Sequence, residues 1–126
     1  MQPFQYYMKT EVVFGPGSEE QTAALVRKHG GSRVLVVYGG GSSIDTAKAI
    51  ALGKAHPGTD IWDFWMKRNN PERTLPVGVV LTLPAAGSET SDSAVLTDEE
   101  TCMKRGLSTD LNRPAFAVLD PCLAAT

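Results

Sequence analysis

The chain has 126 residues, of which 42% are hydrophobic and 21% are charged, and its formal net charge at pH 7 is −2. This length and composition suit one globular domain with a modest core, and they exclude a disordered chain. The small negative charge gives no electrostatic case for nucleic acid or an anionic membrane surface, so we expect neither as a partner.

The sequence also bears on the compartment. The first residues lack a basic stretch followed by an apolar one, and no apolar run approaches the ~20 residues of a membrane span. Cys102 and Cys122 form no CxxC pair, which favours reduced thiols. We therefore expect a cytoplasmic protein.

The chain begins with a predicted strand and a predicted helix. Residues 4–14 end in an apolar stretch before a Gly-Pro-Gly turn, which is typical of a strand end. Ser18 and Gln21 then have the spacing of a capping box. Helical spacing of apolar residues follows and closes at Gly30-Gly31.

A second strand and helix flank three glycines. Val34–Tyr38 is a continuous apolar run, which predicts a strand covered on both faces, as in a parallel sheet. Gly39-Gly40-Gly41 follow, and helical spacing then runs from Ile44 to a stop at Gly53. In α/β proteins this strand–glycine–helix order presents backbone N–H groups to a phosphate.

The rest of the chain predicts further strands. Within residues 59–75, aromatic side chains are expected to cover a core edge, and the basic residues after them to form a solvated loop. Val77–Thr82 follows a helix, which implies a right-handed βαβ crossover and parallel pairing. A hairpin is expected from Ser93–Thr97 and a return near Cys102–Leu107, and Pro114–Leu119 predicts a last strand. The predicted fold is α/β and Rossmann-like: one domain, residues 1–126, with a mostly parallel sheet, flanking helices and a β-hairpin.

The glycine loop has two interpretations. Its glycines allow positive φ, Ser42 can cap the helix, and a pyrophosphate fits the free N–H groups of the first turn. Alternatively, Gly39–Gly41 is only a tight turn and Ser42-x-x-Asp45 only a capping box. Asp45 either complements the helix dipole or faces the crevice and binds a sugar or a reacting group. Lys48 can pair with Asp45 in both cases.

A second small-residue loop, Thr82–Ser91, follows the next predicted parallel strand. Ligands in open α/β sheets lie outside the carboxyl ends of the strands. The loop supplies hydroxyl groups, and Ala85, Ala86 and Gly87 leave room beside them. Two such loops on one edge favour nucleotide binding.

Four stretches carry a family resemblance, and they cover nearly the whole chain. They are Val13-Phe14-Gly15-x-Gly17, Gly39-Gly40-Gly41-Ser42-x-x-Asp45-x-x-Lys48, Leu81-Thr82-Leu83-Pro84-Ala85-x-Gly87-Ser88-Glu89, and Phe116-Ala117-Val118-Leu119-Asp120-Pro121. With them the sequence resembles the iron-type (group III) alcohol dehydrogenases, specifically the butanol-dehydrogenase-like aldehyde reductases that use NAD(H) or NADP(H). The resemblance implies hydride transfer between the nicotinamide and an alcohol or aldehyde carbon, with a divalent metal, iron or zinc, polarising the substrate oxygen.

The resemblance also implies the cofactor contacts. The glycine loop and Ser42 would hold the pyrophosphate, with Asp45 close to the nicotinamide half of the cofactor. Thr82, Leu83 and Ser88 would line the nicotinamide ribose, and Lys104 would reach a ribose hydroxyl. The predicted cofactor-binding residues are Gly39, Gly40, Gly41, Ser42, Asp45, Thr82, Leu83, Ser88 and Lys104.

The metal half of the family pattern is missing. Family members carry an all-helical second domain beyond the Asp-Pro, with one aspartate and three histidines as metal ligands, and this chain ends at Thr126. His29 and His56 are the only histidines, and neither lies in an Asp-x-x-x-His pair. We expect His29 to be a polar residue at a helix end, and we expect this chain to have no metal site and no catalytic residue.

The glycine loop itself looks like two family motifs joined together. Val36–Ser42 matches the first family motif on its left side, and Ser43–Lys48 matches the second on its right side. In the family the second motif lies about two βα units later. We hypothesise that the intervening segment, which grips the adenosine ribose and helps select NAD or NADP, is absent.

Three functions remain open. In the first, the chain is the cofactor domain of an iron-type alcohol dehydrogenase and is inactive alone. In the second, it is a non-catalytic module that binds nucleotide weakly, or that pairs with itself or with a full-length relative. In the third, it is a truncated product without a function. The N-terminal strand edge, roughly Tyr6–Phe14, would support a homodimer.

Overall fold

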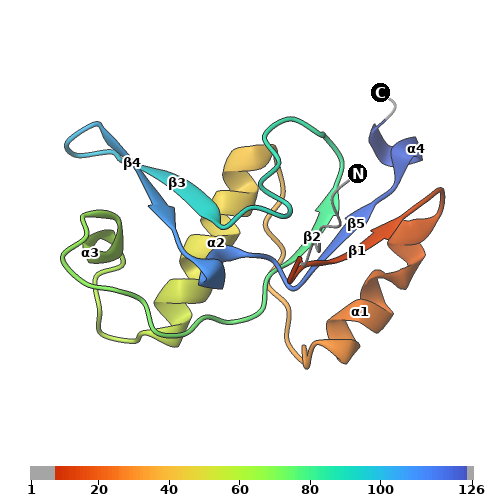
Figure 1. Ribbon diagram of the computed structural model, residues 1–126, viewed down its shortest axis with the longest axis horizontal. Helices are drawn as coiled ribbons and strands as arrows, with labels where there is room; N and C mark the ends of the chain where they lie inside the picture. The colour runs from red at the N-terminus through yellow and green to blue at the C-terminus, as the bar shows by residue number, and fades with distance from the viewer. Residues whose placement is uncertain (1–7, 125–126) are drawn as a thin grey trace, which may run out of the picture.

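The computed structural model describes residues 8–124 and arranges them as two small sheets with helices around them (Figure 1). The elements in chain order are β1 (Glu11–Phe14), the 3-10 turn η1 (Ser18–Gln21), α1 (Thr22–Lys28), α2 (Gly41–Ala55), α3 (Trp62–Trp65), β2 (Gly78–Leu81), β3 (Ser93–Asp98), β4 (Met103–Ser108), the 3-10 turn η2 (Asp110–Asn112), β5 (Phe116–Leu119) and α4 (Pro121–Ala124).

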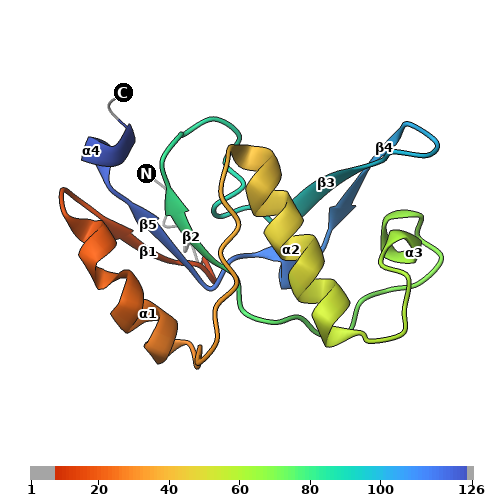
Figure 2. The same ribbon diagram turned by 180° about the vertical axis from the view of Figure 1, so that it is seen from behind.

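The larger sheet is parallel, with strand order β1-β5-β2. Phe116 of β5 is level with Glu11 of β1 and with Gly78 of β2. α1 packs on one face of this sheet (Figures 1 and 2), where Val118 of β5 lies in an apolar cluster with Leu25 of α1. The first three residues of β5, the central strand, are buried.

The smaller sheet is the antiparallel hairpin of β3 and β4, in which Ser93 is level with Ser108. The hairpin packs on α2 and α3 around a second apolar cluster that contains Leu52, Phe64 and Trp65. The indole N–H of Trp65 donates to the Ala94 carbonyl at 3.0 Å, so the buried ring has its polar partner.

The predicted α/β fold class is confirmed. The strand before the Gly-Pro-Gly turn, the helix after the glycine loop, the hairpin and the last strand all form where the sequence predicts them. Residues 4–7 of the N-terminal strand prediction lie outside the described part of the chain. Within residues 8–124, no helix combines the length and apolarity needed to cross a membrane.

The prediction of a covered strand at Val34–Tyr38 is wrong in this structure. The segment is irregular, and Val34, Leu35, Val36 and Tyr38 are 62–90% exposed. Among the described residues it has no hydrogen-bonded neighbour strand, and β2 pairs with β5. Consequently β2 is parallel, as predicted, but its neighbour comes from the far end of the chain rather than from the run before the glycines.

The two predicted capping boxes are also wrong. Gly17, with φ of 75°, precedes η1, and the Ser18 hydroxyl is buried without a hydrogen-bond partner. Gly40 is the N-cap of α2, and Ser42 lies inside the first turn. In both cases a glycine holds the cap position, so no side-chain cap forms.

Candidate functional site

The glycine loop leaves the start of α2 uncapped. Gly39 has φ of 142°, and a Cβ there would lie 2.2 Å from the Ser43 hydroxyl, so only glycine fits. The Ser43 N–H donates to the Gly40 carbonyl at 2.9 Å, and the Ser43 hydroxyl donates to the Tyr38 carbonyl at 3.0 Å. Among the described residues, no acceptor bonds the N–H groups of Gly41 and Ser42. These two donors at the positive end of a 15-residue helix can receive an anion.

The second loop adjoins the first. A Cβ on Gly41 would lie 3.5 Å from the Ala86 Cβ, so the loop after β2 touches the first residue of α2. Figure 1 shows this loop arching beside that end of α2. Gly87 turns the loop with φ of 69°, Ser88 is buried and Leu83 is exposed. The structure thus brings the glycine loop and Thr82–Ser91 to one edge.

Lys48 and Asp45 fasten the far end of this second loop to α2. The fully buried Lys48 ammonium donates to the carbonyls of Ser91 at 3.1 Å and Ser93 at 2.8 Å. One Asp45 oxygen accepts the Val95 N–H at 3.0 Å, and the other lies 3.9 Å from the Lys48 nitrogen without a hydrogen bond. Burial lowers the Lys48 pKa, and the nearby carboxylates, Asp45 first, oppose that shift.

The predicted cofactor-binding residues lie in three places. Gly39–Ser42, Thr82, Leu83 and Ser88 lie on the two adjoining loops, and Asp45 lies one turn into α2, held by β3. Lys104 lies on β4 level with Thr97 and lines a hollow beside Trp65 and Met66 of the α3 region.

Sequence reasoning missed two residues that shape the loops. Ser43 closes the glycine loop through Tyr38, and the Arg113 guanidinium donates to the Thr90 carbonyl at 2.9 Å. The paired serines after the glycines were a signal for Ser43. Arg113 lies far along the chain, and no local pattern connects it with the loop.

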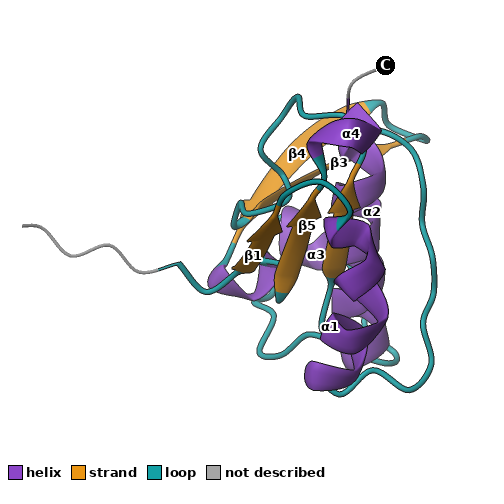
Figure 3. Ribbon diagram, turned by 90° about the vertical axis from the view of Figure 1, so that its right-hand side faces the viewer, coloured by secondary structure: helices purple, strands orange, loops and turns teal. Residues whose placement is uncertain are grey.

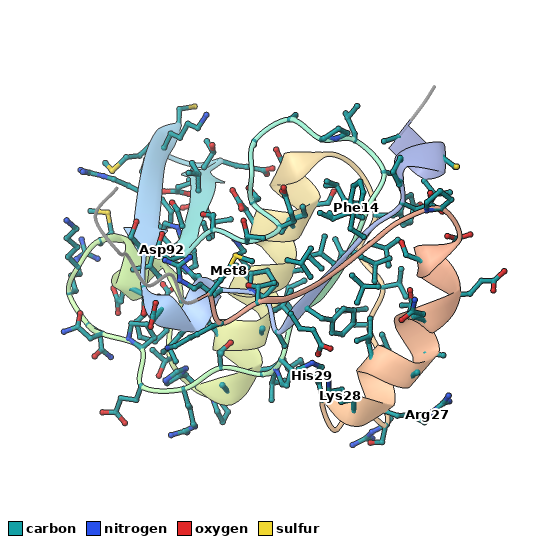
Figure 4. The ribbon with its side chains drawn as sticks, turned by 45° about the vertical axis from the view of Figure 1, so that its right-hand side comes forward. Met8, Phe14, Arg27, Lys28, His29 and Asp92 are labelled. Carbon is teal, nitrogen blue, oxygen red and sulfur yellow. The ribbon has the colours of Figure 1, made fainter. Side chains whose placement is uncertain are left out.

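The histidines are engaged elsewhere. His29, at the C-terminal end of α1 beside Lys28 (Figure 4), lies 3.1 Å from a Glu11 carboxylate oxygen and stacks on Phe116. Lys28 and His29 together hold the Glu11 pKa below its ordinary value. The His56 ring contacts the Leu52 carbonyl through Nδ1 and accepts the Glu72 N–H at Nε2.

These side chains do not fit a metal ion. In the described part of the chain, no three His, Cys, Asp or Glu side chains gather as a metal-binding group. Cys102 and Cys122 are free and exposed.

Comparison with known proteins identifies the family. Residues 36–121 match the family described as iron-containing alcohol dehydrogenase. The chain belongs to this family. It is 47% identical over 87 residues to the probable NADH-dependent butanol dehydrogenase 1 of Bacillus subtilis, an alignment that covers 69% of this chain and 22% of that protein. It is 35% identical over 127 residues to the NADP-dependent alcohol dehydrogenase 3 of Entamoeba histolytica, covering 92% of this chain and 33% of that protein.

The fold of this family member matches solved structures. The NADH-dependent butanol dehydrogenase A of Thermotoga maritima superimposes with a TM-score of 0.77 at 27% identity, covering 100% of this chain and 46% of that one. The sulfoacetaldehyde reductase of Bifidobacterium kashiwanohense, solved with NAD+, gives 0.76 at 19% identity and supports the fold alone. The chain thus spans about a quarter to a third of the curated relatives and about half of the solved chains.

Proposed function

We propose that this family member is a shortened dinucleotide-binding domain that holds the pyrophosphate of NAD(H) or NADP(H) at Gly39–Ser42. The observation that carries the proposal is the uncapped start of α2, where two N–H groups lack an acceptor among the described residues. The adjoining loop supports it, because Ala86, which follows the carboxyl end of β2, lies against Gly41 at the start of α2. The names of relatives that use NADH or NADPH point the same way.

The other cofactor contacts follow from this position. Thr82, Leu83 and Ser88 would line the nicotinamide ribose, and Asp45 would lie near the nicotinamide half. Lys104 would reach a ribose hydroxyl only across the hairpin, so we assign it the weakest contribution of the set.

Hydride transfer between the nicotinamide and an alcohol or aldehyde is the reaction proposed for the complete enzyme, in which a metal polarises the substrate oxygen. The glycine loop supplies backbone donors for the pyrophosphate, and residues 8–124 contain no group of three His, Cys, Asp or Glu side chains that could hold a metal. We therefore propose that the chain alone binds the dinucleotide weakly without turning over an alcohol, with or without added iron or zinc. Turnover by the purified chain would show this proposal to be wrong.

Substitutions at Gly40 test the site. Binding of NADH to each variant is measured by cofactor fluorescence and by calorimetry. A Cβ at Gly40 meets nothing within 4 Å, and its φ of −80° suits any residue. Gly40→Asp places a carboxylate at the N-cap, where it can accept the free Ser42 N–H and sets a negative charge beside that of Gly41. It should stabilise the helix by about 0.5–1 kcal/mol while weakening NADH binding at least ~10-fold. Gly40→Asn is the matched control, because it caps without charge and should weaken binding less. Equal affinities of Gly40→Asp and the parent for NADH would exclude this site.

The joined motif adds an expectation about selectivity. If the segment that grips the adenosine ribose is absent, the chain should bind NADH and NADPH with affinities within about threefold of each other, a difference of about 0.7 kcal/mol. A strong preference for either dinucleotide would count against the missing segment.

Pairing with a second copy, or with a full-length relative, is the alternative function. β1 is an edge strand of the larger sheet, and Val12 and Phe14 of one face are exposed, Phe14 by 73%. Figure 4 shows Phe14 at the end of this strand. Sedimentation of the parent and of Phe14→Lys tests it: a dimer that the substitution dissociates would favour the pairing module.

A further inference from the structure

Two carboxyl groups meet where the turn after β1 lies against the end of β5. Asp120 directly follows β5 and is 3% exposed, and Glu19 belongs to η1; Figure 3 shows β1 and β5 side by side. Glu19 is close enough to Asp120 for a hydrogen bond between the two side chains. If both groups were ionised, neither could donate that bond, and the Glu19 Oε2 atom would stay buried without a partner. Buried oxygens without a partner are rare, so the pair calls for a proton.

The backbone around Asp120 indicates which of the two groups is ionised. The Gly17 N–H donates to one Asp120 oxygen at 2.8 Å, and the Cys122 N–H donates to the other at 2.7 Å. Both oxygens of Asp120 therefore act as acceptors, as the oxygens of an ionised carboxylate do, and such bonds stabilise the charged form. The donor between the two side chains must then be Glu19. A proton on Glu19 Oε2 gives this buried atom its partner.

The charges around the pair favour the same distribution. Within residues 8–124, neither carboxyl group forms an ion pair with a lysine, arginine or histidine. The other titratable groups that act on the pair are Glu20, which repels a charge on Glu19, and the Cys122 thiol. The contact with Asp120 is the main cause that raises the pKa of Glu19, whereas Glu19 and then the Cys122 N–H lower the pKa of Asp120. Two adjacent carboxyl groups that cannot both ionise behave in this way.

We propose that Glu19 and Asp120 share one proton, and that this proton fastens η1 and the start of α4 to the end of β5 as a pH-sensitive clasp. Gly17 and Cys122 both use Asp120 as their acceptor, so the clasp joins backbone groups that lie 103 residues apart to the residue after β5. Loss of the proton puts two charges in contact at a buried position, and this corner of the larger sheet then loosens. The trigger is a rise in pH and not a ligand, so the clasp is independent of the proposed function.

Carboxyl carbon signals of the whole chain, followed by NMR from about pH 3 to about pH 9, test the shared proton directly. Glu19 should titrate above its ordinary pKa of 4.5, and Asp120 below its ordinary pKa of 3.8. The amide signals of Gly17 and Cys122 should shift with the Glu19 midpoint, because both amides donate to Asp120. Titration of Glu19 at or below 4.5 would overturn the shared proton. Amide signals that do not change at the Glu19 midpoint would overturn the clasp.

Glu19→Gln tests the effect on stability, because its amide can donate to Asp120 at every pH and does not titrate. A carboxyl group whose pKa rises on folding stabilises the folded chain below its unfolded pKa, and this stabilisation is lost as the pH rises through the folded pKa. The unfolding equilibrium constant of the parent, relative to that of Glu19→Gln, should therefore increase at least ~3-fold from about pH 5 to about pH 8. Glu20→Gln is the matched control: it removes the same charge from the exposed neighbour and should keep the parent's pH dependence. Equal pH dependence of Glu19→Gln and the parent would overturn the proposal.

Discussion

At the scale of single residues, Lys48 connects α2 to the end of the second loop, a structural role that its sequence motif does not indicate. A fully buried ammonium is costly unless its donors are used, and Lys48 uses them on two carbonyls of the segment that leads into β3. Asp45 supplies the balancing charge and binds β3 through Val95. The pair therefore sets the distance between α2, which begins at the glycine loop, and the second loop.

Replacing Lys48 by methionine should lower the free energy of unfolding by about 3–5 kcal/mol, because it leaves Asp45 as a buried, unpaired charge. Chemical denaturation of the parent, Lys48→Met, Asp45→Asn and the double variant measures this. The double variant should recover at least ~1 kcal/mol relative to additivity, since asparagine keeps an acceptor for Val95 without the charge. Strict additivity would mean that the two residues act independently.

The lowered Lys48 pKa has a consequence for stability against pH. The Lys48 pKa is lower in the folded chain than its ordinary value of 10.5. At a pH just under 10.5, the unfolded chain therefore keeps more of this proton than the folded chain does. The free energy of unfolding should therefore rise with pH in the alkaline window just under 10.5. Denaturation curves across that window should show a smaller rise for Lys48→Met than for the parent. An identical slope would contradict the burial of this ammonium.

At the scale of elements, β2 depends on a glycine where it meets β5. A Cβ on Gly78 would lie 2.1 Å from the tip of the Phe116 ring, which is buried and stacked on His29. Gly78→Ala should therefore cost about 1–3 kcal/mol of stability through overpacking.

Gly106 on β4 offers the matched control for this test, because a Cβ there meets only Val95, at 3.9 Å. Gly106→Ala should change the unfolding free energy by less than about 1 kcal/mol. Phe116→Leu in the Gly78→Ala background should recover part of the loss. A loss equal to that of Gly106→Ala would show that Phe116 can move aside.

Sequence patterns predict where helices and strands form far better than they predict which strands pair with one another. Alternation, turn residues and helical spacing act over a few residues, so β1, α2 and the hairpin could be predicted where they form. Whether Val34–Tyr38 is covered depends on a neighbour strand, and nothing in the run itself encodes one. The sequence predicts that β2 pairs with the strand before the glycine loop. It pairs instead with β5, whose residues lie far along the chain.

In the candidate site, too, local features could be predicted from the sequence and long-range contacts could not. Gly39–Gly41 and the Thr82–Ser91 loop could be singled out locally, and the sheet then brings them to one edge. The role of Arg113 depends on tertiary packing and could not. The serine caps failed because glycine, which favours the left-handed or extended backbone at a helix start, holds the cap position at Gly17 and Gly40.

At the scale of the whole molecule, the larger sheet depends on β5. It is the central strand, the neighbour of both β1 and β2. A chain ending at Ala115 would leave β1 and β2 without a neighbour in this sheet, so we expect it to lose cooperative thermal unfolding. Circular dichroism against temperature measures this. A cooperative transition in the shortened chain would mean that α2 and the hairpin fold independently of the larger sheet.

The position of β5 also orders events during synthesis. Glu11 pairs with Phe116, so the first strand leaves the ribosome about a hundred residues ahead of its neighbour. At roughly 5–20 residues per second, that is a wait of roughly 5–20 s. During this interval the apolar residues of β1 and β2 are without the strand that joins them. A nascent chain of this kind presents two separated apolar strands to chaperones until β5 is made.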